Sequence, residues 1–175
     1  EYYPIIFLFV YITQTMTTSA LDLLSKISNF SGGSLDLKKS FFAKYSLDGV
    51  NSNRMETGLG NLVTDIVREK TQTDLSFIKG GLLKGLIIGG THFNEQELSE
   101  MFSANPKIVT ASMTAQQVVD MVNASVQPDT DVQHESKYYS GNFLQVSGCS
   151  FTYDNRVRNN KLSAMIIGEK LVYFH

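Results

Sequence analysis

The chain has 175 residues, of which 42% are hydrophobic and 18% are charged, and its formal net charge at pH 7 is −2. This size and composition are typical of one globular domain with its own core. The weakly negative charge and the scattered lysines and arginines argue against a nucleic-acid-binding protein. The single cysteine, Cys149, excludes an internal disulfide, and the three histidines share no metal-ligand spacing with it.

The first twenty residues contain an unbroken apolar run at 5–12 (IIFLFVYI), followed by polar and small residues up to Ala20. The run is too short to span a bilayer. A short apolar core followed by small residues is typical of a secretory signal peptide, although the chain starts at Glu1, without a methionine or a positive leading segment. We therefore expect residues 1–20 to be a signal peptide and the protein to be secreted; a buried strand is the alternative.

Residues 21–38 combine a short amphipathic piece with the glycine- and serine-rich stretch SNFSGGS, which predicts a linker. Residues 39–175 are expected to form the folded domain. Two N-x-S/T sequons, at Asn29 and Asn123, are candidate glycosylation sites in a secreted protein.

The domain begins with a predicted strand at 39–47, closed by a turn at Asp48 and Gly49. Apolar residues at helical spacing then predict a helix that runs from about Leu59 to Thr71. A glycine, Gly60, lies where this helix begins, and it costs about 1 kcal/mol relative to alanine. Either another part of the backbone comes close at this point, or the glycine serves packing alone.

The rest of the chain alternates strands and helices. Strands are predicted at 74–78, 107–113, 143–146, 149–153, 162–167 and 170–174. Helices are predicted at 94–102 and after the N-cap Thr114, the second with Val118, Val119, Val122 and Val126 facing inward. The segment 79–90 must turn tightly more than once, and 127–140 is a polar loop. The pattern predicts an α/β (α+β) fold with mixed β-sheet layers packed against helices.

Three blocks of sequence carry a resemblance to a known family. They are LDGVNSNRMETGLGNLVTDIVRE at 47–69, DLSFIKGG at 74–81 and GNFLQVSG at 141–148. In this order they resemble the "LDG…R…ETNLGNL", "NGGGIR" and "G-x-FLQVSG" segments of the C-terminal domain of secreted 5′-nucleotidases and apyrases. The resemblance implies that domain's fold, truncated at its C-terminal end, because the family's late "GGDGF" loop has no counterpart here.

The resemblance also implies a ligand-binding site. Its six residues are Arg54, Lys79, Gly80, Gly81, Lys84 and Phe102. Lys79 stands where the family has the Asn of "NGGGIR", and Lys84 stands where it has the Arg. Phe102 matches the aromatic residue of an "LPF" segment. Arg54 is offset by one position from a family arginine. Lysine offers a point charge in place of a planar fork, so the site resembles a cationic patch for phosphate. The alternatives are solvated loop lysines and a plain core aromatic.

In the family, an N-terminal metallophosphatase half holds two divalent metal ions that cleave the phosphoester. Its "D-x-H" and "GNH" motifs do not occur in these 175 residues. We therefore expect no metal, no cofactor and no catalytic residues in this chain. We expect a secreted, non-catalytic protein that binds a nucleotide, a nucleoside, another small ligand or a host protein. The host protein is suggested by the secreted salivary apyrases of blood-feeding arthropods, which are members of this family. The alternative is a fragment of an active 5′-nucleotidase or apyrase that hydrolyses nucleotide phosphoesters; the oligomeric state is left open.

Overall fold

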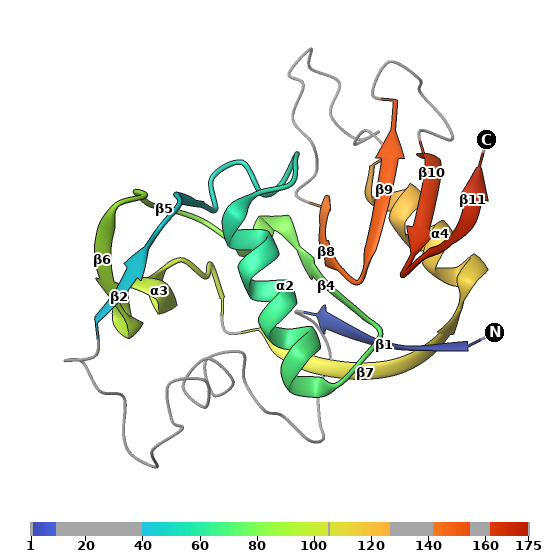
Figure 1. Ribbon diagram of the computed structural model, residues 1–175, viewed down its shortest axis with the longest axis horizontal. Coiled ribbons are helices and arrows are strands. Elements are labelled where there is room, and N and C mark those ends of the chain that lie inside the picture. The colour runs from blue at the N-terminus through green and yellow to red at the C-terminus, as the bar shows by residue number, and fades with distance from the viewer. Residues whose placement is uncertain (1, 10–39, 105, 127–141, 155–161, 175) are drawn as a thin grey trace.

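The structure is a computed structural model that describes residues 2–9, 40–104, 106–126, 142–154 and 162–174 (Figure 1). The predicted linker at 21–38, its sequon at Asn29 and the whole of the predicted loop at 127–140 lie outside the described residues. Within the described part of the chain, no helix is both long enough and apolar enough to cross a membrane.

Strands and short helices alternate along the chain, which confirms the predicted α/β (α+β) class. The strands are β1 (Tyr2–Phe9), β2 (Ser40–Ala43), β3 (Leu47–Asp48), β4 (Leu75–Lys79), β5 (Leu86–Ile87), β6 (Thr91–Asn94), β7 (Lys107–Thr114), β8 (Leu144–Ser147), β9 (Cys149–Tyr153), β10 (Leu162–Ile167) and β11 (Lys170–Phe174). The helices are α2 (Gly58–Thr71), α3 (Glu95–Glu100) and α4 (Ala115–Ser125), with a 3₁₀ turn η1 (Gly80–Leu82) after β4.

The two longer helices are where the sequence predicts them. Helix α2 has Thr57 as its N-cap, with the Thr57 hydroxyl accepting from the N–H of Gly60. Helix α4 starts after Thr114, which forms a capping box with Gln117 as the N-cap prediction requires. The four inward valines predicted for the second helix are all buried. These signals are local, so the sequence alone could supply them.

Two predicted elements differ in the structure. The single strand expected at 39–47 is two short strands, because β2 pairs with β6 while β3 pairs with β5. The helix expected at 94–102 ends at Glu100, because Phe102 forms a bridge with Leu83 instead of continuing the helix. In both cases a distant partner strand decides where the element ends.

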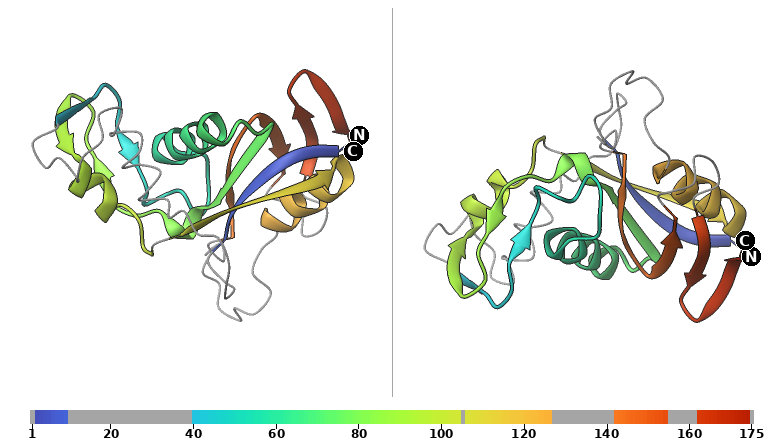
Figure 2. Two further views of the ribbon diagram at one scale, coloured as in Figure 1. Left: turned by 90° about the horizontal axis from the view of Figure 1, so that it is seen from below. Right: turned by 90° about the horizontal axis from the view of Figure 1, so that it is seen from above.

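The main sheet has four strands in the order β7-β1-β4-β8. Strand β1 is parallel to β4 and antiparallel to β7, and it lies between them in both views of Figure 2. Residues 2–9 therefore adopt the strand that the sequence left as the alternative to a signal peptide. A folded structure does not test whether residues 1–20 are removed by processing. The signal peptide therefore stays a prediction.

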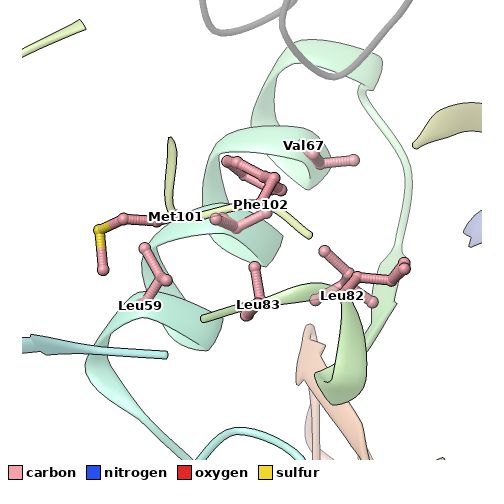
Figure 3. Close-up of a cluster of buried hydrophobic side chains, with 8 residues drawn as sticks. Leu59, Val67, Leu82, Leu83, Met101 and Phe102 are labelled. Atoms are coloured by element: carbon pink, nitrogen blue, oxygen red, sulfur yellow. The ribbon is translucent and has the colours of Figure 1, made fainter. Parts of the chain in front are cut away.

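Strands β4 and β8 lie between two layers that bury their opposite faces (Figures 1 and 2). Helix α2 covers one face, where Leu59, Val63 and Val67 form a core with Ile78 and the chain at 82–83 and 101–102 (Figure 3). Helix α4 and the β11-β10-β9 sheet cover the other face. That second core comprises Leu75, Phe77, Val118, Val119, Val122, Leu162, Met165 and Ile167.

The glycine at the start of α2 is explained by one buried side chain, that of Gln145 on β8, which is 1% exposed. Its Oε1 accepts from the N–H of Thr57 at 3.0 Å, and its Nε2 donates to the carbonyls of Ser52 at 2.7 Å and Met55 at 2.6 Å. A Cβ on Gly60 would lie 2.5 Å from the Gln145 Cγ and closer still to the amide group. Glycine is needed because a side-chain amide, and not the backbone, crosses the first turn of the helix.

A second polar link joins α2 to β8 one turn further along. The buried hydroxyl of Ser147 donates to the carboxylate of Asp65 and accepts from Nε of Arg68 at 2.8 Å. Alternate residues of β8 therefore hold the helix by hydrogen bonds, while Leu144 and Val146 face the second core.

We predict that Gly60→Ala lowers the free energy of unfolding by about 1–3 kcal/mol, because the added methyl group overlaps the Gln145 amide. Gln145→Ala is also destabilising, since it leaves Thr57 N–H and two carbonyls without partners. In the double variant the methyl group has room, so the loss is smaller than the sum of the single losses. Urea unfolding measures all three. Glu69→Ala, at an exposed position on the same helix, is the control. Strictly additive losses of unfolding free energy in the double variant would contradict the overlap.

Candidate functional site

The predicted site is built around the turn that follows β4. Gly80 is buried, and its N–H donates to the carbonyl of Phe143 at 2.7 Å. A Cβ on Gly80 would overlap the Ser52 carbonyl oxygen and lie 2.9 Å from the Cα of Asn53. The loop before α2 thus approaches the turn so closely that only glycine fits there.

Hydrogen bonds make that loop, residues 48–56, a folded unit. The Asp48 carboxylate accepts from the backbone N–H groups of Val50 at 2.8 Å and Asn51 at 3.2 Å, and from the Asn51 side chain at 2.6 Å. Burial acts to raise the pKa of Asp48, but the hydrogen bonds from Asn51 and Val50 and the charge of Arg54 outweigh it and hold this pKa below its ordinary value. The Asp48 carboxylate is therefore ionised at neutral pH.

Ser52 ties the loop to the turn. This residue has no exposed surface, and its hydroxyl lies 2.6 Å from the carbonyl of Gly49 and 2.8 Å from that of Gly80. The N–H of Gly49 donates to the carbonyl of Gly85 at 2.9 Å, so the loop also contacts the far end of the turn. Loop 48–56 and segment 79–85 are consequently held side by side.

On the other side of the turn lies the segment that follows α3. The N–H of Lys84 donates to the carbonyl of Met101 at 2.8 Å, and the N–H of Ser103 donates to that of Leu82 at 2.8 Å. The hydroxyl of Ser103 also donates to the carbonyl of Gly81 at 3.1 Å. Segment 79–85 is therefore the middle one of three adjacent backbone segments.

This arrangement brings the six predicted site residues into one region of the molecule. The side chains of Arg54, Lys79 and Lys84 are exposed, and Arg54 donates to the side-chain oxygen of Asn51. Phe102 is 5% exposed, and its ring lies within the core under α2 (Figure 3). A nucleobase can stack on Phe102 only if this core opens, whereas the three cations are accessible.

A hollow of about 210 Å³ lies on the other side of loop 48–56. Its lining includes Met55, Glu56, Asn61 and three mutually tilted rings, those of Phe143, Phe151 and Tyr153, whose centroids are 5.9–6.2 Å apart. Pockets for drug-sized ligands are typically about 300–1,000 Å³. The hollow is too small for a nucleotide, so it is not the main candidate.

Sequence reasoning missed the part that Gln145 plays in positioning the site. Gln145 fixes the carbonyls of Ser52 and Met55, and therefore the loop that carries Arg54. The signal was present, because Gln145 lies in the family-like GNFLQVSG stretch. No pattern of spacing shows that a glutamine on one strand reaches a loop 90 residues earlier in the chain.

Within the described residues, the geometry adds support neither for a metal site nor for a glycosylation site. Among the described residues, no three His, Cys, Asp or Glu side chains lie together in a way that could hold a metal ion. The sequon residue Asn123 is half-buried on α4, and its Oδ1 accepts from the N–H of Leu162 at 3.3 Å. The expectations of no metal and no cofactor stay predictions.

Comparison with known proteins gives a family match, similar solved structures and one negative result. The family model described as "5′-nucleotidase, C-terminal domain" matches residues 37–172. Among solved structures, the crystal structure of a 5′-nucleotidase precursor from Thermus thermophilus is similar, with a TM-score of 0.56 and 20% sequence identity. This match covers 75% of the present chain and 26% of that chain, and at this identity it supports the fold alone. A search of curated proteins finds no match.

We predict that Cys149 is unreactive in the folded protein. Burial on β9 raises the pKa of its thiol to about 12, so the reactive thiolate is scarce at pH 8. Because Cys149 is only partly buried, the scarcity of the thiolate is what should make Ellman's reagent modify the native protein slowly, and urea-unfolded protein should react much faster. Free cysteine under the same conditions is the control. Rapid stoichiometric modification of the native protein would contradict the protonated thiol.

Proposed function

The chain belongs to the family of 5′-nucleotidase C-terminal domains, and on that premise we propose that it binds a phosphate-bearing small ligand, a nucleotide in the first place, without cleaving it. The observation that carries this proposal is the placement of Arg54, Lys79 and Lys84. Their three exposed cationic side chains belong to segments joined by backbone hydrogen bonds. In a chain of net charge −2, these three cations outnumber the two carboxylates of loop 48–56, Asp48 and Glu56, and we take this excess of positive groups as suited to an anion.

The chemistry of these residues suits phosphate better than it suits a nucleobase. Lysine ammonium groups on flexible stems attract a multiply charged anion without fixing its orientation, while Arg54 adds a planar fork of donors. With Phe102 buried, the aromatic residue that the resemblance assigns to the base is not open to stacking in this arrangement. We therefore propose that affinity rises with the number of phosphates and depends little on the base.

We further propose that the domain does not break the phosphoester by itself. The 175 residues contain none of the metal-ligand motifs that the sequence resemblance associates with cleavage. Cleavage of this type requires two metal ions that stabilise both the attacking and the leaving oxygen. The described residues of the site supply cations for binding, and the carboxylate of Asp48 in loop 48–56 already accepts hydrogen bonds from Val50 and Asn51.

A second candidate function is that of the ligand-binding part of an active 5′-nucleotidase. The observation that favours it is the extent of the structural match, which covers only 26% of the Thermus thermophilus chain. In that case the residues around Lys79 and Lys84 hold the substrate, and the metal chemistry belongs to another part of the protein. Secretion and binding of a host protein, both expected from the sequence, stay proposals under either candidate.

Calorimetric titration of the chain with adenosine, AMP, ATP and inorganic phosphate tests binding. We expect ATP to bind more tightly than AMP, and adenosine to bind least. The double variant Lys79→Ala/Lys84→Ala should weaken ATP binding roughly 3- to 30-fold, as expected for two exposed charge contacts. Lys70→Ala, an exposed lysine near the end of α2, is the matched control and should leave binding unchanged. Equal affinity of the double variant and the parent would contradict the proposed site.

Phosphate release from AMP and ATP in the presence of Mg²⁺, Mn²⁺ or Zn²⁺ tests the absence of cleavage. We expect no release above the protein-free blank. Release that copurifies with the chain and disappears with a chelator would overturn the non-catalytic assignment and leave the binding site untouched.

A further inference from the structure

The main sheet contains one strand that comes from outside the family-matched region. The match spans residues 37–172, whereas β1 is Tyr2–Phe9. Strand β1 does not lie at an edge of the sheet, where an added strand would leave the rest unchanged. It lies between β4 and β7, two strands of the matched region (Figure 2). The matched region by itself therefore has a gap in its sheet, or it closes that gap in another way.

The register shows that β4 and β7 can pair directly. Strand β1 is parallel to β4 and antiparallel to β7, so β7 runs antiparallel to β4. Each residue from Ile5 to Leu8 has one partner on each side. Sliding β7 sideways by one strand spacing would bring four residue pairs together: Leu75 with Ala111, Ser76 with Thr110, Phe77 with Val109, and Ile78 with Ile108.

These four pairs are chemically matched. Three are apolar, and the fourth sets one hydroxyl against another. The Ser76 hydroxyl is buried and has no hydrogen-bond partner in the present arrangement, whereas serine and threonine side chains bond readily across adjacent strands. In the present arrangement Val109 is 49% exposed, and residues 110–112 are exposed as well. Direct pairing would give the Ser76 hydroxyl a partner in Thr110.

We propose that the space between β4 and β7 is a strand-binding site that Tyr2–Phe9 occupies, and that β7 closes onto β4 when this strand leaves. The sheet then has the order β7-β4-β8, composed only of family-matched residues. The domain thus keeps a continuous sheet both with residues 2–9 inserted and with them released, as in the processing of a signal peptide. This inference is independent of the ligand site at Lys79 and Lys84.

Cysteine pairing in the full chain tests the proposal. Ser76→Cys and Thr110→Cys are introduced together with Cys149→Ala, which removes the native thiol. With β1 in place, the two positions are separated by two strand spacings, about 9.6 Å. A disulfide requires Cα atoms closer than about 7 Å. In a second version, Ile6→Pro and Leu8→Pro expel β1, because these two residues are paired with β4 and with β7 and proline cannot donate to either ladder, whereas the native Pro4 is paired with β7 alone. Ile6→Val with Leu8→Val is the matched control that retains the strand.

Under mild oxidation we expect the disulfide to form in the proline version and not in the parent or the valine control. No disulfide in the folded proline version, or equal formation in all three, would overturn the proposal. Hydrogen exchange at 108–113, measured with native Ser76 and Thr110, gives an independent readout if the cysteines disturb folding. Strand β7 is an edge strand in both arrangements, so the amides of this segment that are protected in the parent should stay protected after the proline substitutions. Loss of their protection, or loss of cooperative unfolding in the same proline variant, would also overturn it.

Discussion

The arrangement of this domain depends on the side-chain amide of Gln145. From the middle of β8 it reaches over the first turn of α2 and fixes three backbone groups, at Ser52, Met55 and Thr57. A buried amide is stable only when its donors and acceptors are satisfied, and here the loop before the helix supplies those partners. The same hydrogen bonds that satisfy Gln145 therefore fix the loop that carries Arg54, and they require that residue 60 have no side chain.

The candidate site follows from this constraint. With loop 48–56 held from the β8 side, the fully buried Ser52 can join it to the carbonyl of Gly80. Glycine at position 80 leaves room for the loop backbone. The exposed cations therefore project from loop 48–56 and segment 79–85, whose backbones are already joined by hydrogen bonds. Segments held in this way lose little conformational freedom when an anion binds, which favours binding even by a few exposed charges.

The apolar run at the start of the chain is compatible with two structural roles. An apolar run such as that at 5–12 suits both a secretory signal and a buried strand, because both require uninterrupted hydrophobic residues. In the structure, residues 2–9 satisfy the edges of β4 and β7 together. The unpartnered hydroxyl of Ser76 is one observation behind the proposal that the sheet has a second arrangement.

Features that depend on near neighbours in the chain could be predicted from the sequence. The periodic apolar residues and caps of α2 and α4, the strands from β7 to β11 and the mixed fold class are local patterns, and the structure confirms them. The sequence also singled out the segments of the candidate site, through the family resemblance. Only the tertiary structure decided what depends on distant partners: the division of 39–47 into β2 and β3, the central place of β1, the burial of Phe102 and the reach of Gln145. The reason is that strand pairing and buried hydrogen bonds join residues far apart in the chain, whose separation leaves no periodicity in the sequence.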